Sequence, residues 1–295
     1  MVRKFVILWL LMAFTLCGCH RQSRLPESIG QPYEVVLEGD TDSVVTKMLA
    51  ADVPFLPQPE PMFSIIQVKK GKLSGSYQLV RTRIIVDVNP HHAGYAVKKS
   101  TDEMATPQLI LRIQARSVEE LREKLDGEKL RSLIDRSELK HLASRIHVND
   151  TMQTKVKRLF GIGMKIPQDV NASKEGKDFL WISNNGNTGM QSLLFMKVRT
   201  GGRGVGYHPA GLKLKVDSIL RKNMLGETDS MYMVVPKLAE RGLWEMKGDA
   251  MGGPYVMKTV EKKDEDIVII GFVYAPEMKK RNLIKQLEAV LTTVK

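Results

Sequence analysis

Hydrophobic residues recur along the chain at two spacings, which predict a mixture of strands and helices. Short apolar runs at 84–88, 109–115 and 267–274 predict buried strands. Apolar residues at helical spacing predict long helices over 117–146 and 276–294. Strands and helices therefore alternate through most of the chain.

Two turn signals predict strand hairpins, at the Asn-Asn-Gly sequence 184–186 and at the charged residues 262–265. Local hairpins mixed with packed helices favour the α+β class, with mostly antiparallel sheets, over a doubly wound parallel sheet. Both halves of the chain end with a strand followed by a helix. This pattern predicts two related α+β units, at residues 32–150 and 151–295.

Local signals refine three of the predicted elements. Ser117 and Glu120 form a capping box, and the helix that they begin is expected to bend or break at Gly127. Residues 77–88 predict a single strand. The proline-rich residues 54–61 predict an extended surface segment, because each proline removes a hydrogen-bond donor.

The N-terminus predicts export and a lipid anchor. Arg3 and Lys4 precede an apolar run at 5–16, which is too short to cross a bilayer and has the length of a signal-peptide core. The following Leu-Cys-Gly-Cys sequence resembles a bacterial lipobox, which implies cleavage after residue 18 and lipidation of Cys19. Cys17 is disfavoured as the acceptor because a bulky leucine precedes it, and a plain secretory signal remains the alternative. Residues 19–31 are then a lipidated cysteine and a polar tether.

Composition narrows the possible functions. The 295 residues include 45 Lys plus Arg and 33 Asp plus Glu, a formal charge of +12, which falls to +10 when the signal peptide removes two cations. The two cysteines lie within the first nineteen residues, which excludes a disulfide scaffold and a cysteine zinc site from the body of the protein. Aromatic residues make up 6%, which is low for a protein that stacks on single-stranded nucleic acid. We expect no nucleic-acid partner, since export also removes the chain from such a target.

A family resemblance is carried by short stretches that combine aromatic, glycine and proline residues: Pro32–Glu34, Leu56–Phe63, Gly242–Trp244, Met251–Tyr255 and Gly271–Pro276. Together they resemble the Bacteroidota lipoproteins grouped as domain of unknown function forty-eight thirty-seven, over nearly the whole mature chain. The resemblance implies a lipid-anchored envelope protein and no particular reaction. Surface-displayed lipoproteins of Bacteroidota often carry acidic residues after the anchor; their absence from residues 20–24 therefore implies a protein that faces the periplasm.

Four polar residues at the end of one predicted strand are metal-ligand types: Asp87, Asn89, His91 and His92. Adjacent histidines on an extended chain point to opposite faces, so at most one of the pair can join the aspartate. Asn-Pro is also an ordinary turn sequence, and we favour a plain loop here over a metal site.

Two further histidines, His141 and His147, lie six residues apart on the long predicted helix. That spacing separates their directions by about 120°, so they are not expected to form a helical ligand pair. We predict no metal and no cofactor.

Residues 242–255 are rich in glycine, methionine and aromatic side chains. One interpretation is a bulged strand pair that seals the core. The other is a groove for a partner or ligand, since aromatic and methionine side chains are frequent at such surfaces. The candidate groove residues are Trp244, Met251, Gly252, Gly253 and Tyr255.

Two places predict anion binding. Arg203 lies among the glycines of 201–206, whose amides could form an anion nest, although a mobile hairpin tip explains the same residues. Lys279, Lys280 and Arg281 fall in the first turn of the last predicted helix, where amides and cations together favour an anion. A solvated basic face is the alternative there.

These features favour a non-catalytic, lipid-anchored envelope protein, with the outer membrane as the expected site and the periplasm as the facing compartment. Its expected partner is an envelope protein or an anionic lipid or glycan, because a basic body lies near phosphate and carboxylate groups. The alternative is an envelope hydrolase that uses carboxylates such as Asp87 or Glu245.

Overall fold

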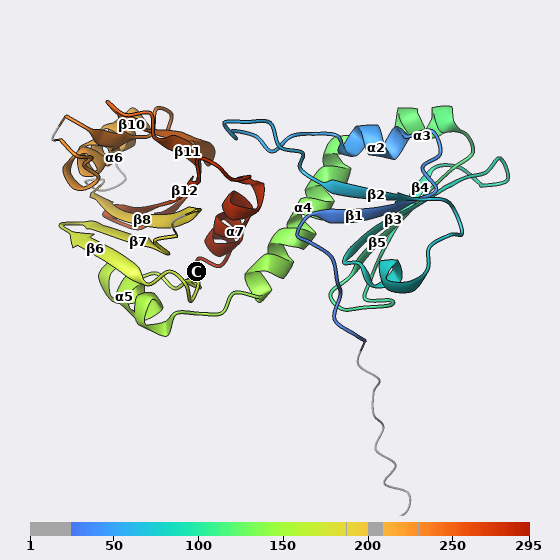
Figure 1. Ribbon diagram of the computed structural model, residues 1–295, viewed down its shortest axis with the longest axis horizontal. Coiled ribbons are helices and arrows are strands. Elements are labelled where there is room, and N and C mark those ends of the chain that lie inside the picture. The colour runs from blue at the N-terminus through green and yellow to red at the C-terminus, as the bar shows by residue number, and fades with distance from the viewer. Residues whose placement is uncertain (1–24, 187, 200–208, 229) are drawn as a thin grey trace, which may run out of the picture.

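The chain forms two units that lie side by side in a computed structural model, which describes residues 25–186, 188–199, 209–228 and 230–295. Each unit has one sheet with helices packed on it (Figure 1). Helix α4 (Gly127–Ser144) of the first unit and helix α7 (Arg281–Thr292) of the second lie between the two sheets. The α+β class predicted from the hydrophobic pattern is confirmed.

The sheet of the first unit is mixed, in the order β2-β1-β3-β5-β4. Its strands are β1 (Glu34–Glu38), β2 (Ser64–Val68), β3 (Thr82–Val88), β4 (Ala96–Thr101) and β5 (Leu109–Ala115). Strand β1 pairs parallel with β2 and β3, and β3 pairs parallel with β5, while β4 is antiparallel to β5. Parallel neighbours need a crossover connection, which helix α2 (Val44–Leu49) and the proline-rich loop supply between β1 and β2. The mostly antiparallel pairing predicted for both units therefore describes only the second.

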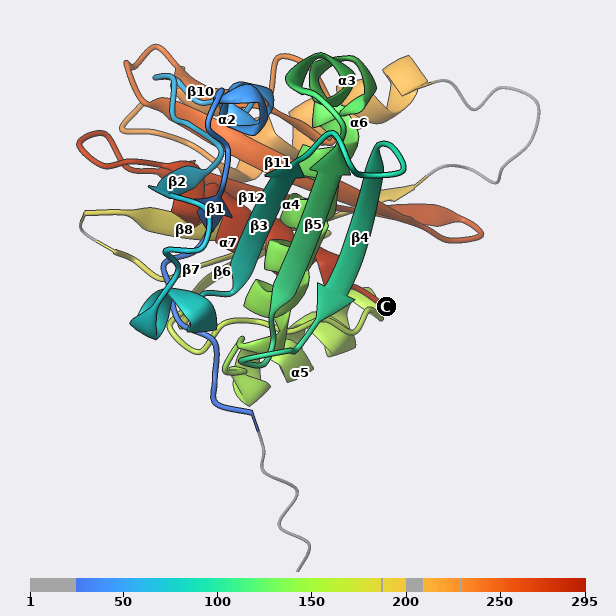
Figure 2. The same cartoon turned by 90° about the vertical axis from the view of Figure 1, so that its right-hand side faces the viewer.

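Helices α2, α3 (Val118–Lys124) and α4 pack against the apolar face of this first sheet. Figure 2 shows β3, β5 and β4 side by side with α4 behind them. The predicted helix start is confirmed, since the Ser117 side chain accepts from the Glu120 amide at 3.2 Å. The predicted break is confirmed too: α3 ends at Lys124, and Asp126 caps α4 by accepting from the Lys129 amide at 2.9 Å.

The sheet of the second unit is antiparallel and curled, in the order β6-β7-β8-β12-β11-β10-β9 (Figure 1). Its strands are β6 (Ala172–Gly176), β7 (Phe179–Ser183), β8 (Met190–Arg199), β9 (Tyr232–Val234), β10 (Arg241–Lys247), β11 (Gly252–Glu261) and β12 (Glu265–Tyr274). Both predicted hairpins are confirmed, as β7 with β8 and β11 with β12.

Strand β12 is the central strand of the second unit and is buried on both faces. Ile267, Ile269 and Val273 pack with α7 and with α5 (Asp150–Phe160) on one side. Val268, Ile270 and Phe272 pack on the other side with α6 (Pro209–Asn223). A continuous apolar run is the pattern expected of such a strand.

The two units are not repeats of one fold, because their sheets differ in strand order and in strand direction. The relationship predicted from their similar endings is therefore wrong. A strand followed by a helix is a common local pattern that does not fix how the remaining strands pair.

Two predicted element boundaries also change. Residues 77–79 lie in a 3-10 helix, η2 (Gly75–Leu79), and the strand β3 begins only at Thr82. Helix α7 begins at Arg281 and not at Pro276. Strand β4 had no clear sequence signal, since it is mostly exposed. Helix α5 does have one, because Met152, Val156 and Phe160 recur at helical spacing between the caps Asn149 and Gly161.

Candidate functional site

The two units meet along α4 and α7, where a lysine is buried between carboxylates. Lys285 of α7 is 1% exposed, and its Nζ lies 2.6 Å from Asp135 Oδ1 of α4 and 3.2 Å from Glu288 Oε2. Its ammonium also lies 5.3 Å from the centre of the Tyr33 ring, whose hydroxyl donates to Asp135 at 2.8 Å. Burial and the neighbouring Asp135 raise the pKa of the Tyr33 hydroxyl, so it remains a proton donor at neutral pH.

A second buried carboxylate holds the first unit's sheet to α4. Glu138 is fully buried and accepts from the Arg81 Nε at 3.0 Å, from the Thr82 hydroxyl at 3.1 Å and from the Tyr33 amide at 3.1 Å. The Arg81 guanidinium also donates to the Gln31 carbonyl at 3.0 Å. A buried charge persists when it is paired and hydrogen-bonded in this way.

The proline-rich loop of the first unit forms a third link. It extends towards α7 in Figure 1, and its Val53 and Leu56 pack against the core of the second unit. The Glu60 carboxylate accepts from the backbone amides of Lys280 and Arg281, at 2.6 and 3.0 Å. These are the amides at the start of α7, so Glu60 caps that helix across the junction.

This cap corrects the anion site predicted at Lys279, Lys280 and Arg281. The helix terminus does bind an anion, but the anion is the chain's own Glu60. Arg281 also donates to the Pro61 carbonyl at 2.9 Å, and Lys280 is 6% exposed. These groups hold the units together and leave the helix terminus closed to an outside ligand.

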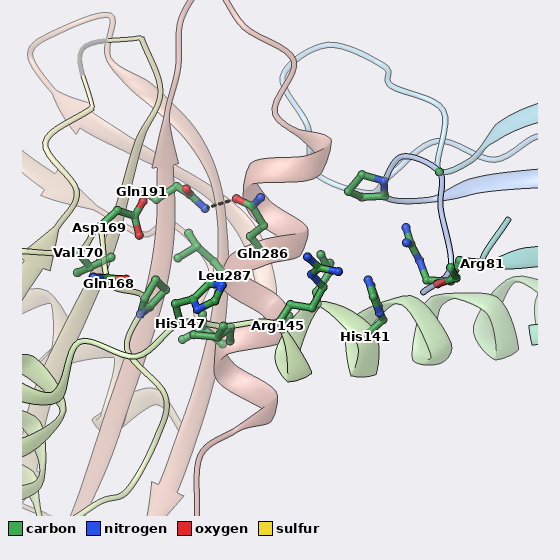
Figure 3. A pocket seen from close by; sticks show the side chains of 18 residues that line it. Arg81, His141, Arg145, His147, Gln168, Asp169, Val170, Gln191, Gln286 and Leu287 are labelled. Atoms are coloured by element: carbon green, nitrogen blue, oxygen red, sulfur yellow. Dashed lines mark hydrogen bonds between the residues drawn. The ribbon is translucent and has the colours of Figure 1, made fainter. Parts of the chain in front are cut away.

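A cavity of about 600 Å³ lies at the same junction, beside α4 and α7. Figure 3 shows its walls: Arg81, His141 and Arg145 on the side of α4, Gln286 and Leu287 on α7, and Gln168, Asp169, Val170 and Gln191 from the second unit. Apolar side chains such as Leu142 and Ile146 complete the lining. A cavity of this size, with an apolar wall and a few polar groups, is typical of a small-molecule site.

Two buried polar atoms of the cavity wall lack a hydrogen-bond partner within the described part of the chain, namely His141 Nδ1 and Ser28 Oγ. His141 is 8% exposed and Ser28 is 7% exposed. Leaving such a group unsatisfied costs about 1–3 kcal/mol. Burial, helped by the nearby Arg81 charge, lowers the pKa of His141 and keeps its imidazole neutral at pH 7.

The segment after the predicted lipid anchor forms another wall of this cavity. Residues 26–29 run along the first unit, with the Ser28 amide donating to the Thr106 carbonyl at 3.1 Å and the Ile29 amide donating to the Leu79 carbonyl at 3.0 Å. The Glu27 carboxylate forms an ion pair with Arg145, the residue that caps the C-terminus of α4. The described part of the predicted tether therefore belongs to the folded unit.

The predicted partner groove is largely closed. Trp244 of β10 is 3% exposed, and its indole donates to the Val273 carbonyl at 3.1 Å and packs edge-on to Phe272. Tyr255 of β11 is 1% exposed, and its hydroxyl donates to the Lys237 carbonyl. Both rings belong to the core beneath α6.

The neighbouring glycines explain why this motif is glycine-rich. A side chain on Gly253 would overlap the Val273 carbonyl, and one on Gly252 would lie 2.8 Å from the Trp244 carbonyl. Met251 is partly buried against the same core. The structure therefore matches the alternative interpretation, a strand pair that seals the core.

The carboxylates proposed for a hydrolase do not share a site. Asp87, at the end of β3, is paired with Lys70 and with His92 at 3.1 Å, and the Lys70 hydrogen bond lowers the pKa of that carboxyl. Asn89 accepts from the His91 amide at 3.0 Å, as in an ordinary turn. Glu245 is exposed on β10 of the other unit. Among the described residues, no three His, Cys, Asp or Glu side chains converge as metal ligands.

Cys19 and Arg203 lie outside the described residues, so their predicted roles stay predictions. Over the ranges that the structure covers, no helix combines the length and apolar character needed to cross a bilayer.

The cavity itself had no sequence signal. Its residues come from the N-terminal segment, the position before β3, α4 and the loop that follows it, the loop before β6, β8 and α7, which are far apart in the chain. The spacing argument against His141 and His147 holds only inside a helix, and α4 ends at Ser144. His147 lies beyond the helix, and both histidines line the same cavity.

Comparison with known protein families divides the chain at the same junction. Residues 149–293 match the family model described as Domain of unknown function (DUF4837), and residues 28–147 match Domain of unknown function (DUF8532). Models of two domains of unknown function thus cover most of the chain, and the DUF4837 match coincides with the second unit. The predicted likeness is confirmed for this unit, while the first unit matches a separate family.

Comparisons with curated proteins and with solved structures do not indicate a function. No curated protein matches the chain. A crystal structure from Bacteroides thetaiotaomicron VPI-5482 is similar at 14% identity and a TM-score of 0.25. The match covers 45% of this chain and 44% of that chain, so it spans less than half of the solved protein.

Proposed function

We propose that the protein is a lipid-anchored, non-catalytic binding protein of the bacterial cell envelope, which faces the periplasm and holds an anionic envelope component. The lipobox-like sequence before Cys19 and the mature charge of +10 support this role. The outer membrane is the proposed location.

The cavity at the junction is the observation that carries the binding role. It has the volume and mixed lining of a ligand site, and Arg145, His141 and His147 supply cationic or hydrogen-bonding groups to one wall. Two of its lining residues, His141 and Ser28, also carry buried polar atoms, Nδ1 and Oγ, that have no hydrogen-bond partner within the described residues. These features favour a bound polar molecule over simple packing between domains.

The lipid anchor would hold this cavity close to a membrane. Glu27, beside the cavity, lies only eight residues after Cys19. Eight residues of fully extended chain reach at most about 28 Å. A ligand released from or carried along the membrane surface would therefore meet the cavity at short range.

The geometry gives the hydrolase alternative no support. A catalytic acid needs a pKa raised towards the working pH, whereas that of Asp87 is lowered. Neither Asp87 nor Glu245 lines the junction cavity.

The anchor is tested by labelling cells with radioactive palmitate. The native protein should take up label and sediment with membranes, and Cys19→Ser should do neither. Cys17→Ser is the matched control and should behave as the native protein does. Absence of label from the native protein would contradict the anchor.

The binding role is tested with the anionic fraction of an envelope extract, incubated with the full lipidated protein in detergent. We expect retention of at least one component at low salt, with weaker retention at high salt and for Arg145→Glu. The binding role would be contradicted if the native protein retained nothing at low salt, or if the native protein and Arg145→Glu retained the same amount.

A further inference from the structure

Arg145 lines the cavity and forms an ion pair with Glu27, which directly precedes the lining residue Ser28. Both side chains are more than half exposed, at 55% and 63%. Exposed pairs contribute little net stability, because water and salt screen both charges. An outside carboxylate can therefore replace Glu27 on Arg145 at small cost.

Arg81 does not offer the same opportunity. Its guanidinium is 7% exposed and bound to the buried Glu138, so displacing that partner would strand a buried charge. Arg145 is thus the cavity arginine whose partner an outside ligand can exchange.

The rest of the lining recognises groups other than a carboxylate. Gln168 carries a carboxamide, which can both donate to and accept from a peptide group, and Gln286 can donate from its Nε2 while its Oε1 accepts from Gln191. The side chain of Gln191 is already engaged with the Leu283 carbonyl at 3.0 Å and with Gln286 at 3.1 Å (Figure 3). His141 Nδ1 and Ser28 Oγ are buried and have no hydrogen-bond partner in the part of the chain that the structure describes.

The charges of the lining favour a monoanion. Asp169 is exposed on the wall formed by the second unit, and it would repel a second negative charge. It would also attract an ammonium group at the other end of a ligand. A phosphate dianion fits this combination less well than a single carboxylate does.

We propose that the junction cavity binds a short peptide-like molecule through its free carboxylate, which takes the place of Glu27 on Arg145. This inference rests on the proposed binding function and narrows its ligand to one chemical class. Glu27 belongs to the segment that follows the predicted anchor. Ligand binding therefore also breaks the ion pair that joins this segment to Arg145.

The test uses the full lipidated protein in detergent, titrated calorimetrically with the dipeptide Ala-Leu. The matched probe Ala-Leu amide lacks the carboxylate and should bind at least tenfold more weakly. Glu27→Gln removes the internal competitor and should tighten Ala-Leu binding about two- to sixfold, as expected for loss of a weak exposed pair.

Arg145→Gln should weaken Ala-Leu binding at least tenfold. Arg136→Gln is the matched control, since Arg136 lies exposed on the same helix and does not line this cavity, and it should bind as the native protein does. Unchanged melting temperatures would show that each variant is folded.

Equal binding of the dipeptide and its amide, no binding of either, or no tightening by Glu27→Gln would overturn the inference. Stronger binding of hexyl phosphate than of Ala-Leu would overturn the carboxylate class and leave the proposed anionic function intact. The proposed function has its own test, the retention experiment above. It fails if the protein retains no component of the anionic envelope fraction.

Discussion

At the scale of single residues, the glycine motif of β11 is explained by contact with neighbouring backbone. The Cβ of an alanine at Gly253 would overlap the Val273 carbonyl oxygen, which also accepts the Trp244 indole bond. Since that oxygen belongs to the central strand β12, it cannot move without disturbing the sheet.

Gly253→Ala is therefore expected to lower the free energy of unfolding by about 3 kcal/mol, the upper part of the range for overpacked cores. Urea unfolding followed by circular dichroism measures this change. Gly163→Ala is the control, because no atom lies within 4 Å of the added Cβ, and it should change stability by less than about 0.5 kcal/mol. Equal effects at both positions would contradict the packing argument.

His141 gives a second prediction, for the dependence of stability on pH. Its pKa is lowered in the folded protein by burial and by Arg81, so below pH of about 6.5 the unfolded chain binds a proton that the folded protein does not. Stability is therefore complete above that pH and falls as the pH drops towards the folded pKa. For one proton the slope is at most about 1.4 kcal/mol per pH unit.

His141→Gln removes this proton uptake and should lose less stability than the native protein between pH 7.5 and about 5.5. Urea unfolding at the two pH values measures the difference. If the free energy of unfolding falls by the same amount in the variant and in the native protein, His141 does not have the lowered pKa that this prediction requires.

At the scale of elements, the start of α7 depends on a residue from the other unit. The Glu60 carboxylate accepts from two amides at the helix start, and it is 9% exposed. A carboxylate there also interacts favourably with the helix dipole.

Glu60→Ala is expected to lower the free energy of unfolding by about 2 kcal/mol, because two buried amides lose a charged acceptor. Chemical denaturation measures the change. Glu123→Ala, at an exposed position on α3, is the control and should stay within about 0.5 kcal/mol of the native protein. A change of that small size for Glu60→Ala would show that the cap does not join the units.

The same helix shows where sequence reasoning succeeds and where it stops. The buried stripe of α7 and the hairpin of β11 and β12 follow from periodicity alone, because local sequence determines them. The true start of α7 depends on Glu60, more than two hundred residues earlier in the chain, which no local pattern can show. For the same reason, the sequence leaves both an anion site and a solvated basic face open at this helix start and does not show that Glu60 occupies it.

At the scale of the whole molecule, the two domains of unknown function form one joined body. Buried Lys285 contacts Asp135 across the junction, and the proline-rich loop adds apolar packing. The class of the fold was predictable, since hairpins and amphipathic helices are local. The parallel pairing of the first sheet and the junction cavity were not, because both depend on contacts between distant segments.

We propose that the junction cavity holds an anionic envelope molecule near the membrane. The most direct measurement is native mass spectrometry of the lipidated protein, released gently from its own membranes. We expect an additional bound mass in the native protein and in Arg136→Gln that is lost in Arg145→Gln. A native protein that carries nothing besides its lipids, or the same bound mass in all three proteins, would contradict it.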